Sequence, residues 1–320
     1  MKKDSTVERI AHIFLNLEKK YKDTIVIVYI SIACFLFSLY DLSIKLLYTV
    51  PPAQILYTSN FLSLILVLTI AHFSNISLNT ENPKNFRLLV GRSIFGVLAL
   101  GTTIISFKIL PMTEGMVIAS TSPIWAPIIC FFIFKERIIV LHVVLALISF
   151  VGIAFISQPT VLFGENQMGN QNNVYVQNEW RMMGYFVSLA CSIFKIFVGI
   201  CIRKLPKNFP PFVIVFYFVL VNSIFGGFLM INSGFKALDL FEICICIFNS
   251  IIFVFSQILY SRCFQLEKVG KVMILTYIQL ILDYFYDVIF LNTEINGYSL
   301  IGCLIIIISL LIFVLIREEK

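Results

Sequence analysis

Apolar segments of about twenty residues alternate with short polar linkers along nearly the whole chain. A helix rises about 1.5 Å per residue, so about 20 apolar residues cross a hydrocarbon core about 30 Å thick. The pattern predicts ten membrane-spanning helices, at residues 24–48, 54–73, 88–108, 114–134, 138–157, 182–202, 210–231, 240–261, 272–291 and 296–316. The expected fold class is therefore all-α, a polytopic membrane protein.

The longest polar linker, residues 158–181, separates two sets of five predicted spans, 24–157 and 182–316. Both sets carry a glycine before and an acidic residue after one apolar helix. These residues are Gly115 and Glu136 in the first set and Gly270 and Glu294 in the second. Because each set holds five spans, the second must be inverted in the membrane relative to the first. Inverted repeats are typical of transporters that bind their solute near the bilayer midplane, between the two halves.

Composition and charge define the class of protein and its orientation. Hydrophobic residues make up 59% of the 320 residues and charged residues only 13%, which excludes a soluble globular domain. If residues 1–23 lie in the cytosol, eighteen of the 24 Lys and Arg residues fall on the cytosolic side and three on the opposite side. This asymmetry predicts that residues 1–23 and the tail 317–320 are both cytosolic. It leaves plasma membrane and endomembrane both open.

The first 23 residues carry no cleavable signal sequence, because Lys and Arg residues interrupt them throughout. Their apolar residues recur at helical spacing, at Val7, Ile10, Phe14, Leu17 and Tyr21. This pattern favours a basic amphipathic helix on the cytosolic membrane face, with a partly ordered tail as the alternative. A protein partner at this segment and a homodimer both stay open.

Signatures of metal sites, enzymes and nucleic-acid interfaces are absent from the sequence. The eight cysteines lie in or beside apolar segments, where a thiol packs as a small hydrophobic group. No cluster of His and Cys has the spacing of a zinc site, and no nucleophile elbow or phosphate-binding loop occurs. No basic surface is interleaved with aromatic residues. We therefore expect no metal, no cofactor, no enzymatic activity and no nucleic acid as partner.

Four charged residues stand out inside the predicted spans, where each costs about 2.5 to 3.5 kcal/mol on membrane-insertion scales. They are Asp41, Lys195, Asp283 and Asp287. Asp283 and Asp287 are four residues apart and share one helix face. Two carboxylates about 6 Å apart repel by about 3 kcal/mol at an effective dielectric constant of about 20. Charge balance thus requires Lys195, a proton, or a positive charge on the solute or on a coupled ion.

These charges support two interpretations. In the first, Lys195 and the two carboxylates of the ninth span face a polar central cavity and exchange partners during transport. In the second, they form a static ion pair that holds two helices together. Asp41 has an alternative of its own, since Lys45 lies four residues further along the helix and could pair with it.

Uncharged polar residues at helical spacing would complete the wall of such a cavity. They are Tyr57, Asn60, Asn249, Gln257, Tyr260, Tyr277 and Gln279. The alternative for each of them is a hydrogen bond between helices, which polar side chains in membrane helices commonly form.

The segment from Arg92 to Glu136 resembles a known repeat unit. Its pattern is Arg92, Gly96, Phe107, Leu110-Pro111, Gly115, Val117-Ile118, Ser122-Pro123-Ile124 and Phe134-Lys135-Glu136. This order and spacing are similar to the EamA-type domain of the drug/metabolite transporter superfamily, and within it to the solute-carrier branch that includes nucleotide-sugar transporters. With the second set of spans, the resemblance covers about residues 26–316.

The resemblance implies a carrier that moves a small polar organic solute by alternating access, surrounded by membrane lipid and without a bound cofactor. It assigns Arg92 either to contact with a substrate anion or to an anchor at the membrane interface, and Glu136 and Glu294 to helix ends. Pro123 and Pro127 are expected to bend the fourth span. A second hypothesis is a membrane scaffold that keeps the transporter fold and binds protein partners through residues 1–23.

Overall fold

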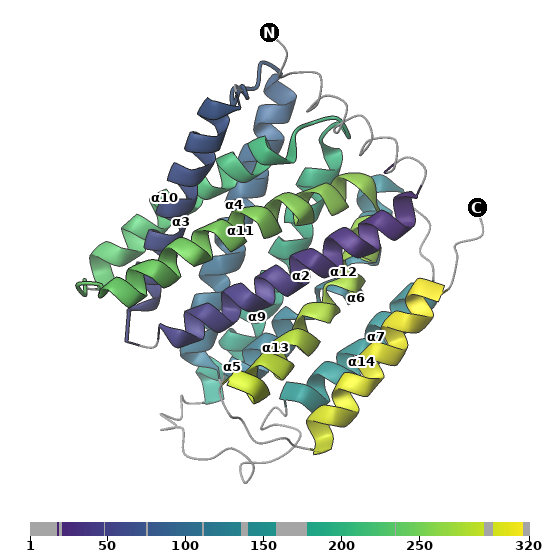
Figure 1. The fold of residues 1–320 in the computed structure, drawn as a ribbon. Coiled ribbons are helices and arrows are strands. Elements are labelled where there is room, and N and C mark those ends of the chain that lie inside the picture. The colour runs from purple at the N-terminus through teal and green to yellow at the C-terminus, as the bar shows by residue number, and fades with distance from the viewer. Residues whose placement is uncertain are drawn as a thin grey trace.

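The computed structural model describes residues 18, 21–47, 49–74, 76–110, 112–135, 140–157, 178–233, 235–290 and 297–315. Within these ranges the chain forms a bundle of helices and contains no strand (Figure 1). The helices are α2 Lys22–Leu46, α3 Pro52–Phe73, α4 Pro83–Ile109, α5 Met112–Ala119, α6 Ser122–Phe134, α7 Val140–Ser157, α9 Asn178–Lys204, α10 Pro211–Ser233, α11 Leu240–Leu266, α12 Val269–Leu275, α13 Tyr277–Phe290 and α14 Gly297–Leu315. Of the amphipathic helix predicted in residues 1–23, residues 1–17, 19 and 20 lie outside the described residues, and so do residues 158–177 of the predicted linker 158–181.

Nine segments of the described chain are long and apolar enough to cross a membrane, and a tenth apolar helix, Val140–Ile156, is shorter. The predicted class of all-α polytopic membrane protein is therefore confirmed. The outer surface of the bundle is apolar as well: Leu304, Ile308 and Leu311 of α14 recur at helical spacing and are more than half exposed. Such a face is suited to contact with lipid acyl chains.

Two of the spans are interrupted near their middle. The fourth is divided into α5 and α6 at Ser120 and Thr121, and the ninth into α12 and α13 at Thr276. The predicted bend of the fourth span is therefore a break, which falls before Pro123; Pro127 lies inside α6. Pro123 occupies the first turn of α6, where its missing N–H costs no helical hydrogen bond. The second break was not predicted.

No proline accompanies the break between α12 and α13. Instead, the Thr276 hydroxyl donates to the Met273 carbonyl at 2.6 Å. The Thr276 N–H also contacts the carbonyls of Val272 and Met273, both at 3.2 Å. A threonine side chain that bonds to its own helix competes with the regular backbone ladder. Thr58 and Thr102 make the same bond within regular helices, so this bond accompanies the irregular turn and does not by itself explain it.

The helices of the two predicted halves pack against one another in a regular scheme. α4 packs along α9, and α11 packs along α2, so the third span of each half lies against the first span of the other. α3 packs with α10, and α7 with α14. We name the two ends of the bundle after α2, which begins at the Lys22 end and finishes at the Leu46 end. α6, α9, α11 and α14 finish at the Lys22 end, where α12 begins.

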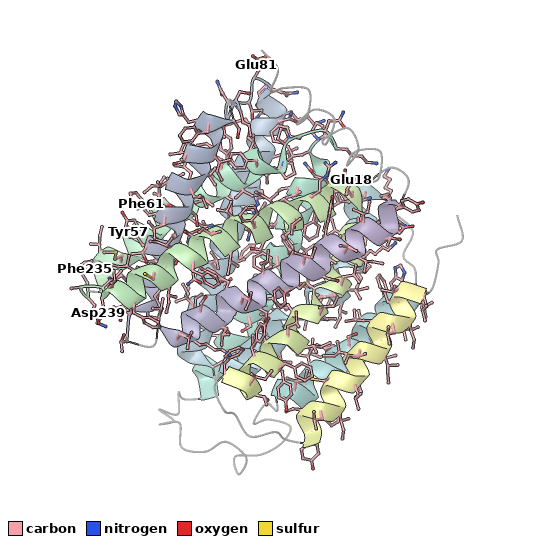
Figure 2. The ribbon with its side chains drawn as sticks, in the orientation of Figure 1. Glu18, Tyr57, Phe61, Glu81, Phe235 and Asp239 are labelled. Atoms are coloured by element: carbon pink, nitrogen blue, oxygen red, sulfur yellow. The ribbon has the colours of Figure 1, made fainter. Side chains whose placement is uncertain are left out.

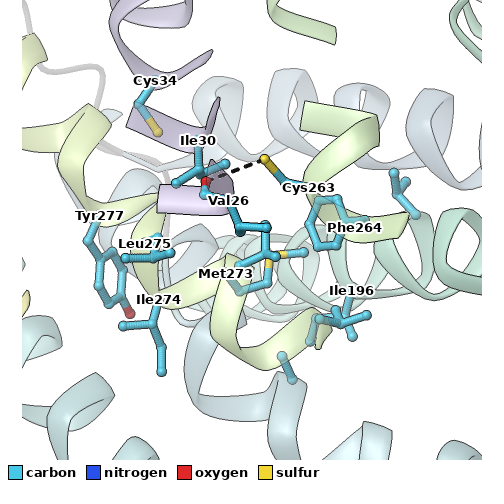
Figure 3. Close-up of a cluster of buried hydrophobic side chains, with 14 of the residues drawn as sticks. Val26, Ile30, Cys34, Ile196, Cys263, Phe264, Met273, Ile274, Leu275 and Tyr277 are labelled. Carbon is cyan, nitrogen blue, oxygen red and sulfur yellow. Dashed lines mark hydrogen bonds between the residues drawn. The ribbon is translucent and has the colours of Figure 1, made fainter. Parts of the chain in front are cut away.

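The apolar core joins α2, α11 and α12 near the Lys22 end (Figure 3). Val26 and Ile30 of α2 are almost completely buried, and so are Cys263 of α11 and Met273 of α12. The Cys263 thiol donates to the Val26 carbonyl at 3.8 Å. This core fixes the first turns of α2 against the α11–α12 connection.

The α7–α14 pair is held at very short range by two glycines. A Cβ atom built on Gly302 would lie 2.5 Å from the carbonyl oxygen of Gly152 and 3.0 Å from the backbone nitrogen of Ile156. Glycine at position 302 therefore allows the two backbones to touch, as small residues commonly do in membrane bundles.

Candidate functional site

The two helix breaks lie against each other in the middle of the bundle. The hydroxyl of Tyr277, the first residue of α13, donates to the carbonyl oxygen of Ser120 at 3.0 Å. Tyr277 is only 2% exposed. The carbonyl oxygen at the α5–α6 break thus accepts a hydrogen bond from the second half of the chain. Tyr277 was predicted to line a polar cavity or to bond between helices, and in the structure its hydroxyl bonds to the backbone of another helix.

The parts of the broken helices nearer the Lys22 end pack together directly. α12 lies against α6, and a Cβ atom on Gly270 would come within 3.2 Å of Pro127 Cγ. The other two parts pack elsewhere, α5 along α9 and α13 along α2. Gly270 therefore allows α12 to pack closely against α6 at the Lys22 end.

Two carboxylates lie between α2 and α13. Asp41 accepts a hydrogen bond from Gln279 Nε2 at 2.9 Å, and Asp283 accepts one from the Ser38 hydroxyl. The two carboxylates interact with each other electrostatically, and Lys45 and Lys195 also interact with Asp41. The structure thus joins Asp283 to Asp41, which lies far away in the sequence. The side chain of Asp287 lies outside the described part of the chain, so its pairing with Asp283 stays a prediction.

Lys195 is exposed although its helix, α9, is enclosed by others. The residues one turn away on the same face are all buried: Cys191, Ser192, Val198 and Gly199. A lipid-facing stripe would continue through these positions, so the exposure at Lys195 is confined to one position of this face. The ammonium group of Lys195 also interacts electrostatically with Asp41 of α2.

Arg92 is buried, with 1% of its surface exposed, so an anchor at the membrane interface is wrong for this residue. Its Nη2 donates to Gln257 Oε1 at 2.7 Å, and its guanidinium carbon lies 3.5 Å from the ring centre of Phe218. The sequence pattern placed Arg92 at the start of a span, whereas α4 begins nine residues earlier, at Pro83. Gln257 makes a hydrogen bond between helices, which the sequence analysis gave as the alternative to a place in the cavity wall.

The remaining predicted residues lie apart from the carboxylates. Asn60 donates to the Leu56 carbonyl of its own helix at 2.7 Å, and α3 packs on α10 and α11. Asn249 accepts from the Ser43 hydroxyl. Pro123 is buried at the start of α6. The other family positions, Pro111, Glu136 and Glu294, lie outside the described residues.

Tyr57 belongs to a separate apolar pocket of about 420 Å³ at the edge of the bundle. Gly227, Met230, Ile231 and Phe235 form the rest of its lining. Figure 2 shows Tyr57, Phe61 and Phe235 gathered at one side of the molecule, opposite Glu18. This pocket contains no charged side chain and is not part of the site at Asp41.

Ion pairs connect the chain before α2 to α11 at the Lys22 end. Glu18 accepts hydrogen bonds from Arg262, from Nε at 3.1 Å and also from Nη2. The Tyr29 hydroxyl donates to the same carboxylate at 3.3 Å. Arg262 in turn donates to the Lys207 carbonyl in the α9–α10 connection at 2.6 Å. One guanidinium group of α11 thereby links the segment before α2 to the α9–α10 connection.

A second ion-paired carboxylate, Glu267, lies in the α11–α12 connection. Its Oε2 is 3.0 Å from Lys22 Nζ and 3.9 Å from Lys271 Nζ. Burial raises the pKa of Glu267, but the Lys268 N–H and the two ammonium groups outweigh it and hold the pKa below its ordinary value. The charged carboxylate therefore stabilises the fold above its ordinary pKa, and this stability is lost as pH falls through the lowered value.

Replacing Tyr277 by Phe should lower the free energy of unfolding by about 1 kcal/mol, because the Ser120 carbonyl loses its donor in a buried site. The matched control is Tyr57→Phe, since the Tyr57 hydroxyl makes no hydrogen bond with described residues and its ring stacks on Phe61. Thermal melting in detergent would measure both. Equal losses in the two variants would contradict a structural role for the Tyr277 hydroxyl.

Comparison with known proteins places this arrangement among membrane carriers. A model of the EamA-like transporter family matches residues 24–158 and 182–315. Solute carrier family 35 member G1 of Homo sapiens is 21% identical, over 88% of this chain and 76% of the relative. Probable transport protein YPL264C of Saccharomyces cerevisiae is 27% identical, over 72% of this chain and 68% of that protein. A solved crystal structure has the same fold, with a TM-score of 0.73 at 16% identity over 89% of this chain and 95% of the other.

Proposed function

This chain belongs to the EamA-like transporter family, and from that premise we propose that it is a secondary carrier of a small polar organic solute that works by alternating access. The observation that carries the proposal is the exposed Lys195 on an otherwise buried face of α9, from which we infer an opening of the bundle that faces the carboxylate of Asp41. Charged groups at membrane depth are costly unless they face a polar cavity, and they commonly mark solute or ion pathways.

The packing of the broken helices supports a state of the transport cycle in which one end of the bundle is closed. α6 and α12 meet at the Lys22 end, whereas α5 and α13 pack on different helices toward the Leu46 end. We assign the Lys22 end to the cytosol from the distribution of Lys and Arg. In this assignment the molecule is closed toward the cytosol, and the opening at Lys195 leads to the opposite side.

The site has the parts that a coupled carrier needs. Two interacting carboxylates and one exposed ammonium group can exchange partners when a charged solute, a proton or an ion enters. The Tyr277 hydroxyl joins the interruption at Thr276 to the Ser120 carbonyl at the other interruption, and broken helices are a common way to build such sites. The two halves are then inverted repeats that move relative to each other around this region.

The accessibility of position 195 tests the proposal without knowledge of the solute. Cys244 is exposed and the other seven cysteines are buried, so Cys244→Ser provides a low-reactivity background. In that background, Lys195→Cys should react with a membrane-impermeant thiol reagent in vesicles of both orientations, and faster from the non-cytosolic face.

The Cys244→Ser protein without the second substitution is the control and should stay unlabelled. Reaction of Lys195→Cys from neither face would contradict a polar cavity. Reaction from one face alone, even after an incubation long enough for the slower cycle of a protein without the Lys195 ammonium group, would contradict alternating access.

A further inference from the structure

Arg92 carries a positive charge deep in the bundle, and none of the described carboxylates balances it. Gln257 is the hydrogen-bond partner of Arg92, whose Nε and Nη1 are buried and have no acceptor among the described residues. None of the ion pairs among the described residues includes Arg92, and the groups that act on it electrostatically are Tyr260 and Cys201. Arg92 thus differs from the lysines and arginines at the Lys22 end, several of which pair with a glutamate.

The position of the guanidinium group is determined by its neighbours. Phe218 of α10 covers one face of the guanidinium plane at 3.5 Å. That ring fits because residue 96 is glycine: a Cβ atom there would lie 2.5 Å from Phe218 Cε2. The Arg92 and Gly96 pair of the sequence pattern therefore has a physical meaning, since the glycine admits the ring that orients the arginine.

Arg92 also lies beside the proposed pathway. Phe95, one turn further along α4, stacks on Phe194 and Phe197 of α9 with ring centres 6.2 and 5.0 Å away. These two rings flank Lys195 in the sequence. The adjacent helices α4 and α9 therefore each carry a cation in this part of the bundle, the buried guanidinium group of Arg92 and the exposed ammonium group of Lys195.

A buried charge that lacks an opposite charge is expensive, because the low dielectric interior cannot replace its hydration. Buried N–H groups without acceptors add to this cost. An oxyanion would relieve both, and arginine is the side chain that binds carboxylate and phosphate oxygens most effectively.

We propose that Arg92 binds an oxyanion, a carboxylate or a phosphate group of the transported solute, and that the substrate class of this carrier is therefore anionic. The inference rests on the proposed transport function. Lys195 receives the anion in the opening, and Arg92 binds it in the part of the bundle that the α6–α12 contact closes. Gln257 positions the guanidinium group through Nη2 and leaves Nε and Nη1 for the anion.

Thermal melting of the purified full-length protein tests this assignment, with inorganic phosphate and succinate as the two oxyanion probes. Sodium chloride at matched ionic strength controls for salt, and choline chloride supplies a cationic solute. At least one oxyanion should raise the melting temperature, and the one that does so distinguishes phosphate from carboxylate chemistry. In Arg92→Gln the apparent affinity for that anion should fall at least about 10-fold.

Two further variants keep the test decisive. Arg87→Gln is the matched control, because Arg87 lies on the same helix and is exposed, and it should respond like the unmodified protein. Gln257→Glu places a carboxylate on the guanidinium group, so it should melt at a higher temperature without anion and lose the anion response. This second variant gives an answer even if Arg92→Gln does not fold.

An undiminished anion response in both Arg92→Gln and Gln257→Glu would overturn the proposal. Stabilisation by choline alone, or by neither oxyanion, would also overturn it. Those outcomes leave the carrier function intact, since labelling of Lys195→Cys from both faces does not depend on the charge of the solute.

Discussion

Replacing Lys195 by Gln is expected to reduce solute flux by about 100-fold, equivalent to a loss of about 3 kcal/mol in the charged interactions of the transport cycle. The ammonium group is exposed in the opening and interacts with Asp41, so its removal leaves two interacting carboxylates without their mobile partner. The measurement is uptake into proteoliposomes, with the solute that gives the largest thermal stabilisation as the transported species.

The control is Lys207→Gln, the same substitution at an exposed lysine in the α9–α10 connection. It should retain normal flux. Asp283→Asn should be impaired as well, because Asp283 interacts with Asp41 and accepts the Ser38 hydroxyl. If Lys195→Gln and Asp283→Asn both reach the membrane and both transport normally, the charges are a static ion pair and the carrier mechanism proposed above fails.

Replacing Gly302 by Ala is expected to destabilise the protein by about 3 kcal/mol, at the upper end of the usual cost of overpacking. The added methyl group would meet the Gly152 carbonyl oxygen at 2.5 Å and the Ile156 nitrogen at 3.0 Å. Both atoms belong to the backbone of α7, so no side chain can rotate away, and the two helices must separate. Denaturation in mixed micelles would give the difference in free energy of unfolding.

Gly297→Ala provides the matched control, since it lies at the start of the same helix and a Cβ atom there meets nothing within 4 Å. It should leave stability unchanged or raise it slightly, because alanine is the better helix former. Equal stability of the Gly302 and Gly297 variants would show that α7 and α14 do not cross as closely as described.

The number and position of the helices could be predicted because membrane spans are set by local composition. About twenty apolar residues between polar linkers suffice, and each predicted span corresponds to a helix or to a broken pair. The sequence indicates the break before Pro123 through its two prolines, although a bend was predicted there. At the break at Thr276 the only local indication in the sequence is a single threonine, and in most helices a threonine only bonds back to its own backbone.

The grouping of the charged residues could be predicted only in part. Spacing along one helix suggested that Asp283 pairs with Asp287 and Asp41 with Lys45, because neighbours four apart share a face. The contact between Asp41 and Gln279 joins residues 238 positions apart and depends on how α2 packs on α13, which no local pattern encodes. Ser38 lies one turn before Asp41 and could have been found from that spacing. The burial of Arg92 follows from the start of α4 at Pro83, well before the apolar run begins.

The hydrogen bond between Tyr277 and Ser120 has a mechanical consequence. Its donor belongs to the second five-helix segment and its acceptor to the first, and both stand where a helix is interrupted. A rotation of one segment must therefore either drag the turn of the other segment along or separate donor from acceptor. In the proposed cycle, this bond therefore favours movement of the two interruptions together, by about the 1 kcal/mol that its loss would cost.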